Sequence, residues 1–389
     1  MPDMRFAPPL AMRVNDRGGG LNQTSVRTYN ERLVMSLLRQ HGSLSRMELG
    51  QRSGLSAQTV SVIVRALERD NLVLAGEAQR GRVGPPSTPI FLNPEGAFSI
   101  GASVAAGMTD VTLIDFNGAI RRHRQIDHDA RAPGERLETI VAAVAEFVAV
   151  TAPPWRDRIV GVGVSLPEDI DSWSREEPAI WNAATVEAAI AKATDFSIFI
   201  QNDVTAAAGA EVIFGVARNM GDFAYLFVGR STECRLVLNH RVYAGSPRPK
   251  QGRRNEYGGS MVSLTDLEEL AAARSAEPSI VWRAFDRWDE LEGALPEWIE
   301  RCAASLADSI AAMRAFVRVG AVVIEGRMPR PILERLCQAT SRLTVEERFA
   351  EGAPKIIPGE IGPFAKAIGA GSLPLHSRFM VEQVGLAPT

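Results

Sequence analysis

Residues 58–65 carry side chains that can bond to the edges of nucleic-acid bases and to phosphate groups. They combine short polar groups with one guanidinium: Gln58, Thr59, Ser61 and Arg65. Amide and hydroxyl groups exchange hydrogen bonds with base edges, and an arginine binds bases or phosphates. This chemistry requires that one structural element present all four groups together.

The surrounding residues predict two helices joined by a tight turn. Ser45 and Glu48 have the S-x-x-E spacing of a capping box, in which each side chain accepts from the other residue's backbone N–H. Gly54 suits the positive φ of the turn, and Ser56 suits the N-cap of the next helix. In that helix, four apolar residues recur at i, i+3, i+4 and i+7 and predict one buried stripe: Val60, Ile63, Val64 and Leu67.

A basic hairpin is predicted after the second helix. Residues 72–74 and 90–92 favour paired strands, and the loop between them contains Arg80 and Arg82 beside glycines. Such a loop is typical of a wing that reaches a minor groove or a phosphate row. We therefore expect a winged helix-turn-helix. The candidate DNA contacts are Arg46, Gln58, Thr59, Ser61, Arg65, Arg80 and Arg82.

Each of these features also has a simpler interpretation. A capped helix pair fits a small helical subdomain that binds nothing, and the two arginines fit a solvated loop. The agreement of the box, the turn glycine, the polar face and the basic loop favours DNA binding.

Charge is distributed unevenly along the 389 residues, although the net charge is only −3. Residues 1–92 hold 12 arginines and 7 acidic residues, whereas residues 93–389 hold 31 basic and 39 acidic residues. A basic head on an acidic body fits a nucleic-acid-binding module joined to a part with another task. The three cysteines are far apart and indicate neither a disulfide framework nor a zinc site, so a cytoplasmic setting is expected. We expect no signal peptide and no membrane span.

The order of the predicted elements favours two or three domains. Residues 1–23 are predicted to form a disordered arm and residues 24–92 the winged module. Residues 93–215 and 216–389 are predicted to form two α/β lobes, with the C-terminal segment returning to the first. Three antiparallel strands, a helix, a strand, a helix and a strand are predicted twice, which indicates a two-lobed body with a cleft.

Several motifs resemble the ROK family (repressors, open reading frames, kinases), in its transcriptional-repressor branch. The resemblance covers residues 24–379 and rests on GVGVSLPEDID at 161–171, IQNDVTAAAGAE at 200–211, LVLNHRVYAG at 236–245, NEYGG at 255–259 and VVIEGRM at 322–328. It implies an α/β fold in which the winged helix-turn-helix precedes a two-lobed, actin-like (ribonuclease H-like) body of the ATPase type.

The chain departs from the pattern of the family's kinases at both phosphate loops. Their opening D-x-G-x-T corresponds here to residues 103–108, SVAAGM, which lack the acid. The second loop, GRSTECR at 229–235, is bulky and charged where small residues would cradle phosphate. The family's zinc-binding histidine corresponds to Gly259, and its cysteine motif is missing. We therefore expect no catalytic residue, no metal and no cofactor.

The candidate ligand contacts are Asn202, Asp203 and Glu256. Their amide and carboxylate groups exchange hydrogen bonds with neighbouring hydroxyls, as a sugar would require. In the family's kinases the residue at Asp203 is the general base, but without a phosphate donor it would only accept from a hydroxyl. Asn202 and Asp203 also fit a strand-to-helix turn in which Asp203 caps the helix.

The sequence thus predicts a cytoplasmic transcriptional regulator, a repressor of carbohydrate-related genes. Its expected partners are double-stranded operator DNA, a second copy in a homodimer, and a sugar or sugar derivative in the cleft of a non-catalytic body. Two alternatives stay open. One is a sugar kinase with a regulatory head, and the other is a ligand-independent regulator whose body only dimerises.

Overall fold

The computed structural model describes residues 23–78, 87–105, 107–127, 133–167, 182–243, 261–347 and 352–381. The chain forms two compact units, residues 1–206 with 366–389 and residues 207–365. The first unit contains the N-terminal head and lobe 1, and the second is lobe 2. The boundary between the units after residue 206 falls inside the helix Asp203–Ile213, whereas the sequence predicts a boundary between residues 215 and 216.

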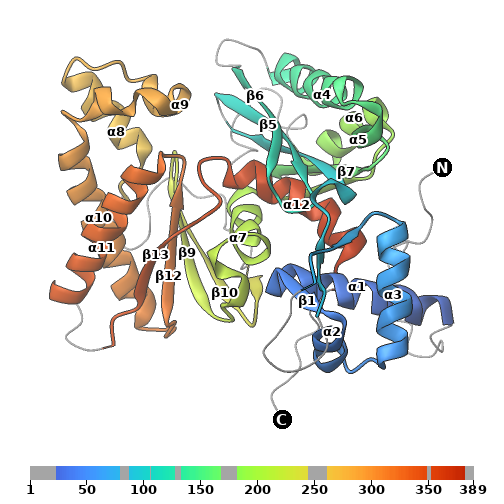
Figure 1. Cartoon of the computed structure of the whole chain (residues 1–389). Helices are drawn as coiled ribbons and strands as arrows, with labels where there is room; N and C mark the ends of the chain where they lie inside the picture. The colour runs from blue at the N-terminus through green and yellow to red at the C-terminus, as the bar shows by residue number, and fades with distance from the viewer. Residues whose placement is uncertain are drawn as a thin grey trace. The chain divides into compact units, whose positions relative to one another are not determined.

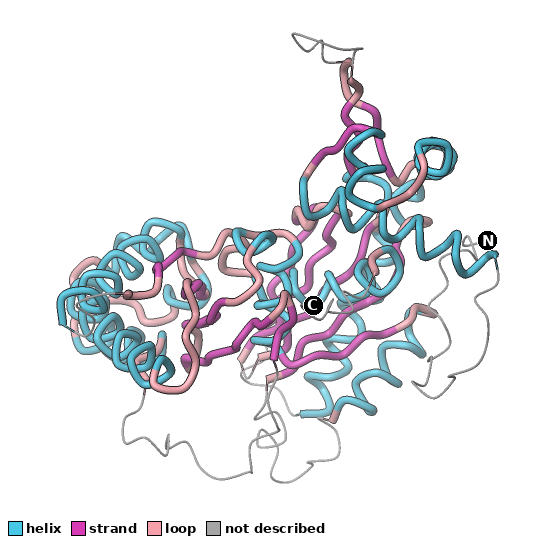
Figure 2. Tube along the Cα trace, turned by 90° about the horizontal axis from the view of Figure 1, so that it is seen from below, coloured by secondary structure: helices cyan, strands magenta, loops and turns pink. Residues whose placement is uncertain are grey.

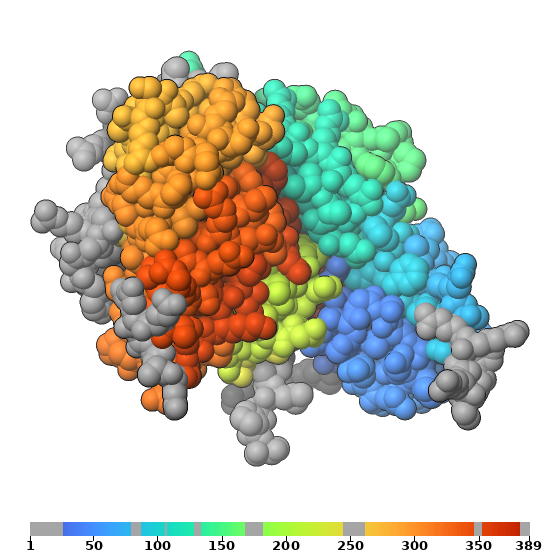
Figure 3. All heavy atoms as spheres, turned by 60° about the vertical axis from the view of Figure 1, so that its left-hand side comes forward, coloured from blue at the N-terminus to red at the C-terminus, as the bar shows by residue number. Residues whose placement is uncertain are grey.

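The head is a winged helix-turn-helix, which confirms the predicted fold class. It consists of α1 (Gln23–His41), α2 (Arg46–Ser53) and α3 (Ala57–Arg69) beside a small sheet of β1 (Ser43–Ser45), β2 (Val73–Ala75) and β3 (Pro89–Leu92). The sheet is antiparallel in the order β1-β3-β2. Strand β1 was not predicted, because its residues also carry the capping signal of α2. In Figure 3 the head is the compact blue group of atoms next to lobe 1.

Lobe 1 is built on a five-stranded sheet in the order β6-β5-β4-β7-β8. Its strands are β4 (Phe98–Val104), β5 (Met108–Asp115), β6 (Ile120–Asp127), β7 (Ile159–Leu166) and β8 (Ile198–Asn202). The first three pair antiparallel, and β4, β7 and β8 pair parallel. The helices α4 (Pro133–Val150), α5 (Pro153–Arg156) and α6 (Ala183–Thr194) accompany it, and apolar residues of α4 and α6 share one buried core with the strands.

Helix α12 (Ala365–Phe379) packs on β4 and β7 of lobe 1 with backbone against backbone (Figure 1). A Cβ on Gly101 would overlap the carbonyl oxygen of Ala367, and one on Gly163 would overlap that of Ala370. Glycines on the strands therefore allow this close approach. The last helix of the chain is thus part of the first lobe.

Lobe 2 repeats the sheet order of lobe 1 as β11-β10-β9-β12-β13. Its strands are β9 (Phe223–Val228), β10 (Thr232–Leu238), β11 (Arg241–Tyr243), β12 (Ala321–Gly326) and β13 (Lys355–Pro358). Its helices are α8 (Leu264–Ala273), α9 (Ile280–Arg283), α10 (Leu295–Arg314) and α11 (Arg330–Glu347), and α7 (Asp203–Ile213) crosses the unit boundary. Figure 2 shows the strands of each lobe accompanied by helices. The predicted duplication is confirmed.

Helix α1 joins the head to lobe 1. The guanidinium of Arg39 donates to the carbonyl oxygen of Phe116 and, at 3.1 Å, to Oδ1 of Asn117. It also lies 5.2 Å from the centre of the Phe116 ring. Just beyond α12, the backbone N–H of Val381 donates to Oγ of Ser36 at 3.0 Å. The head is therefore held by lobe 1 and by the end of α12. No helix among the described residues is long and apolar enough to cross a membrane.

Candidate nucleic-acid interface and ligand site

The capping box at the start of α2 fixes the first helix of the helix-turn-helix. The backbone N–H of Glu48 donates to Ser45 Oγ at 3.2 Å, and the N–H of Ser45 donates to Glu48 Oε2 at 2.8 Å. The bond from the Ser45 N–H, and next the bond from the Ser45 hydroxyl to Glu48 Oε2 at 2.7 Å, hold the pKa of the Glu48 carboxyl below its ordinary value. Gly54 then ends the helix in the left-handed region, with φ of 71°. The predicted box and turn are confirmed.

Helix α3 has the predicted buried stripe and N-cap. Ser56 Oγ accepts from the backbone N–H of Thr59 at 3.1 Å. The helix buries Val60, Ile63, Val64, Ala66 and Leu67. Because these residues occupy one side, the other side of α3 stays in solvent.

The exposed side of α3 carries the predicted polar groups, although not all of them are equally available. Gln58 and Arg65 are exposed. Thr59 and Ser61 are half-buried, and the Ser61 hydroxyl donates to the carbonyl oxygen of Ala57 at 2.8 Å. Arg46 forms an ion pair with Glu68 at 3.2 Å that links α2 to the end of α3. Gln58 and Arg65 are therefore the side chains most free to meet a nucleic acid.

The structure adds an apolar side chain to this surface. Val62 is 55% exposed in the middle of the same side of α3, and Met47 on α2 is 69% exposed. Neither Val62 nor Met47 was predicted from the sequence as a contact, because only hydrogen-bonding side chains were considered, although Val62 follows Gln58 by one helical turn. Arg80 and Arg82 lie outside the described residues.

In lobe 1, Asn202 and Asp203 lie where β8 gives way to α7. Asn202 Oδ1 accepts from the N–H of Thr205 at 2.9 Å, and Asp203 Oδ1 accepts from the N–H of Val204 at 2.7 Å. Both side chains therefore hold the first turn of α7, as the alternative interpretation expects. Asp203 is 3% exposed, and its second carboxylate oxygen is directed to another element.

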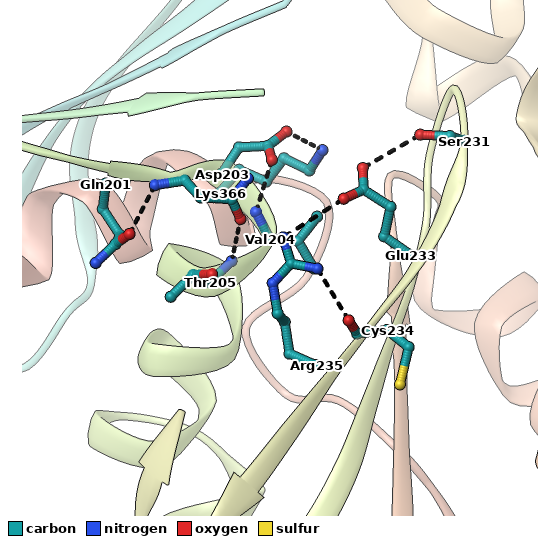
Figure 4. Close-up of polar contacts among 10 residues, drawn as sticks. Gln201, Asp203, Val204, Thr205, Ser231, Glu233, Cys234, Arg235 and Lys366 are labelled. Carbon is teal, nitrogen blue, oxygen red and sulfur yellow. Dashed lines mark hydrogen bonds and ion pairs between the residues drawn. The ribbon is translucent and has the colours of Figure 1, made fainter. Parts of the chain in front are cut away.

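Lys366 is the partner of Asp203 that the sequence does not indicate. Its ammonium group donates to Asp203 Oδ2 at 2.5 Å (Figure 4). The Lys366 carbonyl oxygen accepts from Ser165 Oγ at 3.3 Å, so the first turn of α12 also contacts the end of β7. The two residues are 163 positions apart, and no local motif marks the lysine. The third candidate, Glu256, lies outside the described residues.

In lobe 2, the turn from β9 to β10 is occupied by its own side chains. Ser231 Oγ donates to Glu233 Oε1 at 3.2 Å, and Arg235 lies 3.7 Å from Glu233 (Figure 4). The guanidinium of Arg230 stacks 4.5 Å from the centre of the Trp282 ring. This loop therefore presents charged groups that already interact with one another rather than a cradle of free backbone N–H groups.

Lobe 2 also buries two carboxyl groups together. Glu211 on α7 and Glu325 at the end of β12 are both 0% exposed. Glu211 Oε1 accepts from the N–H groups of Glu360 and Ile361, at 2.7 and 2.9 Å, and Glu325 Oε2 accepts from that of Gly362 at 3.2 Å. Burial, and next the charge and hydrogen bond of Glu211, raise the pKa of Glu325 well above its ordinary value.

Backbone N–H groups of the loop after β13 thus bind both carboxyl groups of this pair. Among the described residues, no group of three or more histidine, cysteine or acidic side chains is arranged to hold a metal ion.

Comparisons with known proteins match both parts of the chain. Residues 101–258 match the ROK family, and residues 27–73 match the winged helix-turn-helix DNA-binding family. The Sinorhizobium fredii protein y4fQ is 27% identical over 91% of this chain and 93% of its own length.

Two characterised relatives match over a shorter region. The xylose repressor of Bacillus spizizenii is 24% identical over 58% of this chain and 59% of its own length. The Escherichia coli DNA-binding transcriptional dual regulator NagC is 23% identical over 58% of this chain and 56% of its own length. The chain thus spans less than two thirds of each of these two proteins.

Solved structures share the fold. A ROK family transcriptional regulator, a homolog of the E. coli MLC protein, has a TM-score of 0.63 at 18% identity, covering 91% of this chain and 97% of its own. A ROK family glucokinase from Streptomyces griseus, in complex with glucose and AMPPNP, has a TM-score of 0.55 at 15% identity, covering 71% and 99%. Regulators and kinases both have this fold, so the local chemistry has to distinguish them.

Proposed function

Because the chain carries a ROK-family domain behind a winged helix-turn-helix, we propose that it is a transcriptional repressor of carbohydrate-related genes. It binds operator DNA through α3 and responds to a sugar or sugar derivative. The observation that carries this proposal is the capped helix α3, which buries its apolar stripe and leaves Gln58 and Arg65 exposed.

The electrostatics of the head support DNA binding. Arg65 and Arg69 are exposed on α3, so the helix brings positive charge to the phosphates that border a major groove. Gln58 and Arg65 lie seven residues apart on one side, within reach of neighbouring base pairs. Arg80 and Arg82 in the wing, and Arg46, would add phosphate or minor-groove contacts. A homodimer would place two heads on two half-sites.

The DNA contact is tested by changing Arg65. We expect Arg65→Ala to weaken binding to the protein's own upstream DNA by about 1–3 kcal/mol, the value of a good arginine contact to a base. Fluorescence anisotropy at constant salt measures this loss. Arg301→Ala, on α10 and half exposed, is the matched control and should bind DNA as the unchanged protein does. Equal affinities for the unchanged protein and Arg65→Ala would remove Arg65 from the interface.

The ligand part of the proposal rests on Asn202, Asp203 and Lys366. These groups combine an amide, a carboxylate and an ammonium at the carboxyl end of the parallel strands β7 and β8, where α/β proteins bind ligands. Hydroxyl groups of a sugar would exchange hydrogen bonds with all three. Glu256, the remaining candidate, stays part of the proposal.

Helix α12 supplies a route from this site to the head. Lys366 in its first turn bonds to Asp203, and Val381 just beyond its last turn bonds to Ser36 of α1. The 15 residues between its ends span about 22 Å. A ligand that draws Asp203 away from Lys366 therefore acts on an element that also holds the DNA-binding module, which gives the two sites a physical connection.

The ligand site is tested by thermal denaturation with sugars, amino sugars, sugar phosphates and polyols. A ligand at 100 times its Kd adds about 2.7 kcal/mol of stability. We expect one class to raise Tm for the unchanged protein and not for Asp203→Asn, which should still bind DNA. A ligand that stabilises both proteins equally binds elsewhere. No shift with any of them supports the ligand-independent regulator, in which the body only dimerises.

We propose further that the body does not transfer phosphate. The β9–β10 turn supports this, because Glu233 would repel a phosphate and Arg230 is stacked on Trp282. The alternative, a sugar kinase with a regulatory head, requires sugar-dependent hydrolysis of ATP or formation of a sugar phosphate. An assay for either product with the same sugars decides between them.

A further inference from the structure

Val62 stands out on α3 because nothing in the folded head calls for an exposed valine there. The side chain is 55% exposed, whereas the neighbouring Val60, Ile63 and Val64 are at most 4% exposed. A β-branched residue has a lower helix propensity than most polar alternatives, so Val62 does not favour the helix either. A single exposed apolar residue needs no partner by itself, but Val62 lies on the side of α3 that carries the candidate DNA contacts Gln58 and Arg65, so a partner that binds this side would contact it.

The surroundings of Val62 identify the chemistry of that partner. Gln58 precedes it by four residues and Arg65 follows it by three, so all three share one stripe of the helix. A protein partner would be met by a larger apolar patch, but this stripe continues with a neutral amide on one side of Val62 and a guanidinium on the other. Among the groups that a base pair presents in the major groove, the 5-methyl of thymine is the apolar one.

We propose that Val62 contacts the 5-methyl group of a thymine and is a specificity-determining residue of α3. The inference rests on the proposed function, since it requires that α3 enter a major groove. It adds to that function a base identity that none of the polar candidates supplies.

The helix geometry limits where this thymine lies. With a rise of about 1.5 Å per residue, Val62 is about 6 Å along the axis from Gln58 and about 4.5 Å from Arg65. Successive base pairs are about 3.4 Å apart. The thymine is thus one or two base pairs from the positions that Gln58 and Arg65 contact, on the stretch between them.

The experiment removes the methyl group from the DNA and the side chain from the protein. A high-affinity duplex is first selected from random sequences with the unchanged protein. Each thymine is then replaced singly by deoxyuridine, which lacks only the methyl. Anisotropy gives Kd for the unchanged protein, Val62→Ala and Met47→Ala. Val62→Ala should fold, because alanine at an exposed helical position favours the helix, and circular dichroism checks this.

We expect one thymine, or its symmetry mate in the other half-site, at which deoxyuridine weakens binding of the unchanged protein about 4-fold, the value of one buried methyl. The same replacement should leave the Kd of Val62→Ala unchanged. It should weaken binding of Met47→Ala by the same factor as for the unchanged protein. Equal losses in the unchanged protein and Val62→Ala at every thymine would overturn the inference. Loss of the effect in Met47→Ala alone would also overturn it and would assign the contact to α2.

A separate result would overturn the proposed function itself. If the unchanged protein selects no duplex above the random pool, the head does not recognise DNA by sequence. A failed coupling between Val62 and a methyl, in a protein that does select DNA, leaves the proposed function standing.

Discussion

The two lobes build the same sheet but neutralise their buried charge in different ways. In lobe 1, Asp203 is paired with the ammonium group of Lys366. In lobe 2, Glu325 is paired with another carboxyl, that of Glu211, and burial and next the charge of Glu211 raise the pKa of Glu325 well above its ordinary value. A raised pKa favours the uncharged form of a carboxyl. The lobe with the ion pair is also the one that contains the candidate ligand groups Asn202 and Asp203.

The two arrangements also differ in the backbone N–H groups that their carboxyls bind. The Glu211 and Glu325 carboxyls accept from the loop after β13, at Glu360, Ile361 and Gly362. Asp203 instead accepts from one backbone group, that of Val204, and from Lys366. The carboxyl pair thus organises a loop, and the ion pair leaves a lysine that a ligand can displace.

The largest expected effect comes from breaking the ion pair. Lys366→Met should lower the free energy of unfolding by about 2 kcal/mol, because it leaves the Asp203 carboxylate buried without a cation. This value is below that of a fully buried pair, since the Lys366 side chain is 23% exposed. Urea denaturation at neutral pH measures the change.

The double variant Asp203→Asn with Lys366→Met is the control for this prediction. It removes both charges, so it should recover a large part of the lost stability. If it is as unstable as Lys366→Met alone, the loss comes from the packing of α12 and not from an unpaired charge.

The second largest expected effect is a dependence of stability on pH that arises from Glu325 in lobe 2. The raised pKa of Glu325 means that the folded protein binds a proton which the unfolded chain releases above its ordinary value of 4.5. The contribution of Glu325 to stability therefore falls as the pH rises above that value, by at most about 1.4 kcal/mol per pH unit. Glu325→Gln does not titrate at this position and keeps a donor toward Glu211.

The measurement is the free energy of unfolding of both proteins between pH 5 and pH 8. We expect the stability of Glu325→Gln to decrease less steeply with pH than that of the unchanged protein. Parallel curves would show that Glu325 does not exchange a proton on unfolding, and the contrast between the lobes would then concern geometry alone.

The smallest expected effect concerns Glu48, a carboxyl group whose pKa is lowered rather than raised. Its contribution to stability therefore changes with pH in the opposite direction to that of Glu325. Since the pKa of Glu48 in the capping box is lowered, its contribution is present above its ordinary pKa and is lost as the pH falls. Glu48→Ala should cost about 0.5–1 kcal/mol at pH 7 and less below pH 4. Thermal denaturation at the two pH values measures it. A cost that grows in acid would contradict the assigned hydrogen bonds.

Local patterns predicted the parts of the molecule that local interactions determine. The box of Ser45 and Glu48 and the stripe from Val60 to Leu67 both lie within a few residues, and the structure has them as predicted. The repeated order of elements in the two lobes was also predicted, because strand and helix signals alternate in the same way twice.

Contacts between distant residues were not predictable in the same way. Lys366 reaches Asp203 across 163 positions, and Glu211 accepts from Ile361 across 150. A lone lysine in the first turn of a helix, or a glutamate within a helix, carries no signal of its partner. Strand β1 was missed for another reason, since its three residues serve both the sheet and the cap of α2.

The placement of α12 on the sheet of lobe 1 has a consequence for how the protein is made. The ribosome synthesises the strands of lobe 1 first, but the helix that packs on Gly101 and Gly163 comes only after residues 207–365. At about 5–20 residues per second, roughly 10–30 s pass before that helix leaves the ribosome. During this time the side of the sheet that carries Gly101 and Gly163 lacks the helix that covers it, and the head lacks the anchor at Val381. The head thus gains its contact with Val381 only after residues 207–365 and α12 have been synthesised.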